Sequence, residues 1–158
     1  MKKIVLIVAV IALFGCNKSN EINDQFNLDN GIEFSVFNSI DEDLLDTSMP
    51  NHYEVNGIKL FYKVNGKTNE VYNSEMDNPR NYKIYKHENE YRIRVFMNNT
   101  ETSEKPVTYI QWNNNDTDTI EVSYERTGNA ILKRKVWLNG KQIWDRALNK
   151  EEYYQLIK

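Results

Sequence analysis

Between residues 31 and 145, apolar side chains recur at every second position, and Asn-Gly pairs or other turn residues interrupt them at short intervals. The segment from Ile58 to Val64 alternates apolar with mainly polar residues, and Asn65-Gly66 follows it directly. A period of two is typical of a strand with one buried face. Asn-Gly is favoured in tight hairpin turns because both residues tolerate a positive φ. The pattern therefore predicts short strands joined by tight turns.

About eight such strands are expected, and no long helix follows residue 31. They lie near residues 32–36, 58–64, 70–72, 82–85, 91–97, 107–112, 120–124 and in the two arms around Asn139-Gly140. The predicted fold class is all-β, an antiparallel sandwich. Strand number and spacing favour an immunoglobulin-like sandwich, and a small closed barrel is the alternative.

The last hairpin allows a register to be predicted. With Asn139-Gly140 as a two-residue turn, Val136 lies opposite Ile143. Trp137 and Trp144 then lie diagonally on one face, where cross-strand pairs contact each other. The hairpin is therefore expected to present two tryptophans on the same side of the sheet.

A short helix is expected after this hairpin. Asn149 is placed to cap it, Glu152 follows three residues later, and Leu148 can pack against Tyr153. Apolar side chains at positions 153, 156 and 157 then share one helical face. The sequence predicts that this helix covers one edge or end of the sheet.

The tryptophans are the candidate ligand-binding residues. Trp137 and Trp144, with Trp112 as a third member, would stack on sugar rings or hold a protein partner if their face is exposed. If the face is buried, the same residues form part of a sandwich core. The sequence leaves both alternatives open.

A loop site for a hard cation is a further hypothesis. Asn114, Asp116, Asp118 and Glu125 have the offsets of positions 1, 3, 5 and 12 in an EF-hand loop. Thr119 occupies the sixth position, where an EF-hand requires Gly, so an EF-hand is excluded. A looser cation site near Asp116 and Asp118 stays open beside ordinary turn chemistry.

Catalytic residues are not expected. His52 and His87 are the only histidines, and neither lies in a nucleophile or metal-binding motif. The sequence has no GxSxG, no HExxH and no glycine-rich phosphate loop. These features predict a protein that is not an enzyme and that uses no cofactor.

The N-terminus predicts an export signal. Lys2 and Lys3 precede eleven apolar residues, Ile4 to Phe14, which suit a signal peptide but are too few to span a bilayer. Leu13-Phe14-Gly15-Cys16 then resembles the lipobox of bacterial lipoproteins. The resemblance implies cleavage before Cys16, the only cysteine, and attachment of acyl chains such as palmitate to it. This residue is thus the expected membrane anchor.

The expected organisation is a signal peptide (1–15), a flexible polar tether (16–30) and a single β domain (31–158). Without the two lysines of the signal, 18 basic side chains remain against 23 acidic ones, a formal charge of −5. This charge argues against nucleic acid as a partner. A lone cysteine also excludes an intrachain disulfide.

Several segments are family-like, namely Pro50-Asn51-His52-Tyr53 with residues 58–62, Tyr109-Ile110-Gln111-Trp112, and residues 135–140. Together with the lipobox they resemble the small, uncharacterised lipoproteins of Bacteroidota. This resemblance implies a lipid-anchored protein of the cell envelope at the outer membrane, with the periplasmic or surface face undecided. The expected function is a non-enzymatic binding module for an envelope protein. A carbohydrate-binding module is the alternative.

Overall fold

The period-two segments form strands that turn their apolar side chains toward a shared core. The computed structural model describes residues 25–158. Its strands, with one short 3-10 turn η1 (Val55–Gly57), are β1 (Asn27–Asp29), β2 (Gly31–Phe37), β3 (Lys59–Val64), β4 (Lys67–Glu70), β5 (Tyr82–His87), β6 (Glu90–Phe96), β7 (Val107–Asn113), β8 (Asp116–Arg126), β9 (Ala130–Leu138), β10 (Lys141–Asp145) and β11 (Tyr153–Ile157).

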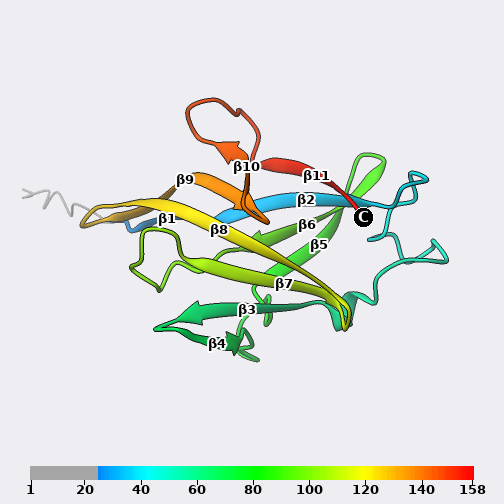
Figure 1. Cartoon of the computed structure of the whole chain (residues 1–158), viewed down its shortest axis with the longest axis horizontal. Helices are drawn as coiled ribbons and strands as arrows, with labels where there is room; N and C mark the ends of the chain where they lie inside the picture. The colour runs from blue at the N-terminus through cyan, green and yellow to red at the C-terminus, as the bar shows by residue number, and fades with distance from the viewer. Residues whose placement is uncertain (1–24) are drawn as a thin grey trace, which may run out of the picture.

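The strands form two open sheets (Figure 1), which confirms the all-β sandwich and rules out the closed barrel. One sheet has the order β1-β9-β8-β7-β3-β4, with β10 also paired to β9, and the other has the order β11-β2-β6-β5. The sets β2-β6-β5 and β4-β3-β7-β8 match strands B-E-D and C′-C-F-G of an immunoglobulin-like sandwich. Strands β9, β10 and β11 extend this arrangement.

The sandwich is mixed rather than purely antiparallel. β1 pairs in parallel with β9, and β11 pairs in parallel with β2. Both parallel strands lie on sheet edges and are separated in sequence from their partners by most of the domain. A short-range pattern cannot predict such pairings, because each joins a strand near the start of the domain to a strand near its end.

The core lies between the sheets. Inward-facing residues alternate along the strands, for example Ile32, Phe34 and Val36 on β2 and Ile93 and Val95 on β6, all at most 1% exposed. Trp112 from β7 packs in the same core and stacks on Tyr53, with ring centroids 5.5 Å apart. The alternation expected for these strands is therefore confirmed.

The last hairpin has the predicted turn but not the predicted register. Asn139 and Gly140 have φ values of 50° and 80°, as a tight Asn-Gly turn requires. A β-bulge between Gln142 and Trp144 then places Trp144, not Ile143, opposite Val136. The bulge turns the larger indole into the core, where it removes more apolar surface from water than Ile143 would.

The predicted C-terminal helix is wrong, because residues 153–157 form strand β11. β11 lies along the edge of β2, from Tyr153 opposite Glu33 to Ile157 opposite Phe37. Asn149, the expected cap, instead accepts a hydrogen bond from the backbone N–H of Asp145 at 2.8 Å. An isolated helix of two turns is marginal, whereas the edge of β2 offers unpaired backbone groups.

The segment expected to be a tether, 16–30, overlaps the sandwich. Residues 27–29 form β1 beside β9, so the folded part begins before residue 31. Figure 1 shows the described chain entering beside β9 and ending at the opposite end of the sandwich, near the end of β2. Cys16 and the expected signal peptide lie outside the described residues.

Candidate functional site

The three candidate tryptophans do not form an exposed platform. Trp112 and Trp144 are 1% and 3% exposed and belong to the core. Trp137 is half-buried on the outer side of the sheet, where the ammonium of Lys105 lies 4.1 Å from its ring centroid. Because the bulge separates Trp137 from Trp144, the hypothesis of a tryptophan platform is wrong for this structure.

Asp116 and Asp118, the residues near which the sequence left a cation site open, both form ion pairs with Lys158. Lys158 Nζ lies 2.7 Å from Asp116 Oδ1 and 2.6 Å from Asp118 Oδ2. Asp118 also accepts hydrogen bonds from Trp112 Nε1 and Asn139 Nδ2, both at 2.7 Å. Burial acts to raise the pKa of Asp118, but these hydrogen bonds outweigh it and leave the pKa below its ordinary value. The loop is therefore an internal ion-pair site.

The two histidines have different local surroundings. His52 is at a turn, where Nδ1 lies 2.6 Å from the carbonyl oxygen of Met49 and Nε2 lies 3.8 Å from Glu54. His87 is the last residue of β5 and lies on the outer face of the β11-β2-β6-β5 sheet. Among residues 25–158, no group of three or more His, Cys, Asp or Glu side chains is placed to hold a metal ion.

The outer face of the β11-β2-β6-β5 sheet carries a charged network. The Arg92 guanidinium lies 4.0 Å from the ring centroid of Tyr153 and 3.6 Å from Glu33. Arg94 lies 3.1 Å from the same carboxylate. Burial acts to raise the pKa of Glu33, but hydrogen bonds from Tyr85 and Arg94 outweigh it and lower the pKa. These charges already satisfy one another, so the face has few groups left for a ligand.

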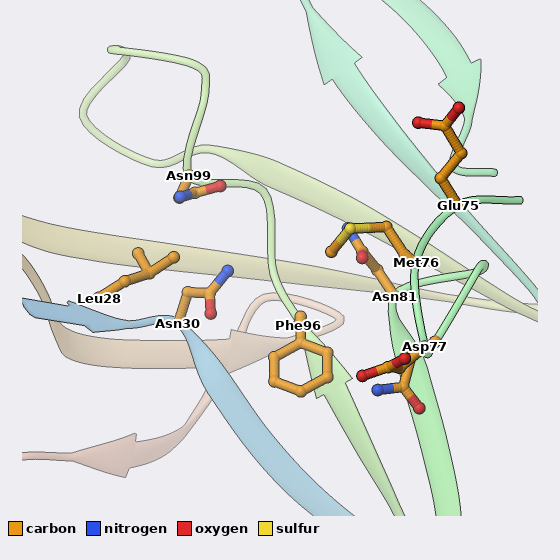
Figure 2. Close-up of a pocket in the computed structure, with 9 residues that line it drawn as sticks. Leu28, Asn30, Glu75, Met76, Asp77, Asn81, Phe96 and Asn99 are labelled. Atoms are coloured by element: carbon orange, nitrogen blue, oxygen red, sulfur yellow. The ribbon is translucent and has the colours of Figure 1, made fainter. Parts of the chain in front are cut away.

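A cleft of about 460 Å³ at the end of the sandwich where β1 enters is a better candidate. Figure 2 shows Leu28 and Asn99 on one side, Met76 and Asn81 on the other, and Asn30 and Phe96 between them. The remaining lining residues are Glu75, Asp77 and Asn78. The volume lies in the range of small-ligand and peptide-anchor pockets.

The cleft combines apolar side chains on its two sides with polar and acidic groups around them. Leu28 and Met76 are 47% and 54% exposed, which is unusual for large apolar side chains that flank the same hollow. Four of the nine lining residues are asparagines, two are acidic and none is basic. A fully apolar pocket would favour a lipid tail, whereas this lining favours a ligand with both apolar and polar or positively charged groups.

Local structure holds the cleft in shape. Asn81 has a left-handed φ of 55°, and its Nδ2 donates to the hydroxyl of Tyr62 at 3.1 Å. That hydroxyl donates to the carbonyl oxygen of Phe96 at 2.7 Å. Burial raises the pKa of Tyr62 to about 12, so the hydroxyl keeps the proton that it donates. Between the two sides of the cleft, Asn30 donates from Nδ2 to the carbonyl oxygen of Met97 at 3.0 Å.

A second hollow of about 420 Å³ continues from the cleft across residues 77–80. It shares Asp77 and Asn78 with the first and adds Tyr72, which is exposed and has the Arg80 guanidinium 5.4 Å from its ring centroid. The loop from residue 71 to 81 thus separates two adjoining hollows. An extended ligand could occupy both.

Sequence reasoning missed this cleft for two reasons. Leu28 falls in the expected tether, and residues 75–78 fall between the strands expected at 70–72 and 82–85, where no site was predicted. One signal was available: Phe26 and Leu28 are apolar at the same alternate positions as Ile32 and Phe34, with Asn30 as the interruption between the two pairs. These two residues were a sign that the domain begins before residue 31.

The comparisons with known proteins give no relative. No protein-family model, no curated protein and no solved structure matches the chain. No helix in the described part of the chain is long and apolar enough to cross a membrane.

Proposed function

We propose that this chain is a non-enzymatic lipoprotein of the cell envelope whose β-sandwich binds an extended segment of a partner protein in the cleft around Leu28 and Met76. The observation that carries the proposal is the pair of exposed apolar side chains, Leu28 and Met76, on opposite sides of a hollow that is otherwise lined mainly by amide and acidic groups at the β1 end of the domain. Protein interfaces have the same anatomy, with apolar anchors at the centre and polar groups around them.

Charge favours a basic segment. Glu75 and Asp77 both lie on the Met76 side of the cleft, and none of the lining residues is basic. A partner residue with an apolar stem and a cationic end would bury its stem against Leu28 and Met76 while its charge reaches Asp77. An extended peptide would continue into the second hollow toward Tyr72.

The expected anchor would hold the cleft near a membrane. Eleven residue steps separate Cys16 from Asn27 at the start of β1. A fully extended chain of that length spans about 40 Å. With acyl chains on Cys16 the anchor is stable rather than reversible. Tethering would raise the local concentration of the cleft for partners in the same membrane.

A photo-reactive residue at position 76, introduced in intact cells, tests this proposal. The matched control is position 148, because Leu148 is also a large exposed side chain and does not line the cleft. We expect one envelope protein to cross-link at 76 and not at 148, and the cross-link to weaken when Cys16→Ala removes the anchor. Equal capture at both positions, or no protein at 76, contradicts the proposal.

Binding of the captured segment to the purified protein then measures specificity. Leu28→Glu and Met76→Glu should each weaken binding at least about tenfold, roughly 1.4 kcal/mol, while Leu148→Glu leaves it unchanged. Asp77→Asn should weaken binding mainly at low salt, because it removes one charge at the rim. Equal affinity of all variants would refute the cleft as the binding site.

A glycan ligand is the second proposal, and the asparagines favour it. The amides of Asn78 and Asn99 each carry two N–H donors and one acceptor, and Asn30 and Asn81 each keep one N–H beside the one that bonds within the protein, which suits sugar hydroxyls. A glycan array tests this proposal. Binding that is lost with Met76→Glu and kept with Leu148→Glu would indicate that the ligand of this cleft is a glycan and not a peptide.

A further inference from the structure

Lys133 is a lysine with a completely buried side chain. Its exposure is 0%, and its ammonium lies 4.7 Å from the ring centroid of Trp144. Lysines are almost never fully buried without a partner, because removing the charge from water is costly. Lys133 therefore marks a special site between the sheets rather than an ordinary core position.

Two carboxyl groups approach the amine, one from strand β1 and one from the residue just before β11. Lys133 Nζ lies 3.0 Å from Asp29 Oδ1 and 2.9 Å from Glu152 Oε1, and it donates to the carbonyl oxygen of Gly31. β1 pairs in parallel with β9, with Asp29 opposite Leu132, so Asp29 and Lys133 are held side by side by the sheet. An amine and a carboxyl group are thus fixed in contact with a second carboxylate beside them.

The second oxygen of each carboxyl group has its own cation. Asp29 Oδ2 lies 2.6 Å from Arg146 Nη1, and Glu152 Oε2 lies 3.4 Å from Arg94 Nη2. The arrangement contains a nucleophile (Lys133), an electrophilic carbon (Asp29 Cγ), a proton acceptor (Glu152) and a positive group at the oxygen where charge would develop (Arg146).

We propose that Lys133 and Asp29 condense to an isopeptide bond that covalently joins β9 to β1. A proton moves from the ammonium to the Asp29 carboxylate, which leaves a neutral amine and a neutral carboxyl group. Nζ then attacks Cγ, and the negative charge develops on Oδ2 beside Arg146. Glu152 takes a proton from Nζ and delivers it to Oδ1, which leaves as water. One N–C bond forms, one C–O bond breaks, and no cofactor or oxidant is consumed.

Physical chemistry favours the step at this site. Fixed contact between nucleophile and electrophile replaces a bimolecular encounter, which is worth effective molarities of about 10⁵–10⁸ M in well-oriented cases. The product removes the fully buried charge of Lys133 together with the partly buried charge of Asp29. Its new N–H can donate to the carbonyl oxygen of Gly31 and its new carbonyl can accept from Arg146, so the product amide has partners in place.

Such a bond would strengthen the point where the chain enters the domain. β1 is a strand of only three residues, and it is the first strand of the described chain. Pulling on the N-terminal side would load β1 directly, and the ladder to β9 is the only pairing described for it. A covalent link to Lys133 would carry that load. This inference depends on the geometry around Lys133 and not on the cleft.

Peptide mass spectrometry of the purified full-length chain tests the bond. We expect a branched peptide that joins the segment containing Asp29 to the segment containing Lys133, lighter than the two separate peptides by one water, with no tryptic cleavage after Lys133. Glu152→Gln should fold, as judged by circular dichroism, and yield far less of the branched peptide.

Lys133→Met is the matched control, because it fills the same space with an apolar side chain. It should show only linear peptides of full mass. Separate full-mass peptides from the folded native chain would mean that Lys133 and Asp29 form an ion pair only, which overturns the proposal. A loss of water that persists in Lys133→Met would indicate dehydration elsewhere, for example at Asp29-Asn30, and would also overturn it.

Discussion

Replacing Trp144 by Ala should destabilise the domain far more than replacing Trp137. Trp144 is 3% exposed, and its Nε1 donates to the carbonyl oxygen of Glu151 at 2.8 Å. Truncating a buried aromatic residue to Ala costs about 3–5 kcal/mol, a large share of the roughly 5–15 kcal/mol that stabilises a typical domain. Trp137 is only partly buried, so its truncation removes less apolar surface from the protein together with the contact to Lys105, and about 1–2 kcal/mol is expected.

Urea unfolding followed by far-ultraviolet circular dichroism measures both costs, because this signal does not depend on the tryptophan removed. The midpoint should fall strongly for Trp144→Ala and slightly for Trp137→Ala, with the slope against urea unchanged in both. Equal costs, or a larger cost for Trp137→Ala, would contradict the hairpin register with the bulge. Equal costs are what the straight register, with both indoles on one face, would produce.

The ion pairs of Lys158 give two further predictions. Lys158→Met should cost about 2 kcal/mol in unfolding free energy, because Asp118, with a side chain 7% exposed, loses a charged hydrogen-bond partner; a change within error would contradict this. The pKa of Asp118 is lower in the folded chain than its ordinary 3.8, so its contribution is present at neutral pH and is lost as the pH falls below 3.8. Lys158→Met should therefore flatten the acid dependence of the urea midpoint, and an unchanged dependence would refute the assignment.

Local patterns predicted most of the sandwich. The alternation of Ile58 to Val64 became β3, and Asn65-Gly66 became a turn with both φ values positive. The sequence also indicated the immunoglobulin-like class, through the number and spacing of strands. These features are local because side-chain alternation and turn geometry depend on neighbouring residues.

The failures share a different origin. At the last hairpin, the turn alone favoured a straight register, but burial of Trp144 favoured a bulge. At the C-terminus, residues 149–157 carried a good capping pattern, but residues 153–157 paired with the free edge of β2 as a strand. In both cases a contact distant in sequence outweighed a local preference, which is the common reason why propensity fails.

By itself, the sequence determined the strand pattern, the turns and the lipobox-like N-terminus, whose anchor on Cys16 stays a prediction. Only the tertiary structure decided which residues meet. The cleft takes Leu28, Met76 and Phe96 from separate segments, and Lys133 meets Asp29 across 104 positions. Periodicity records which side of a strand is buried, but it holds no information about which distant strand lies beside it, because that choice is made by the packing of the whole sandwich.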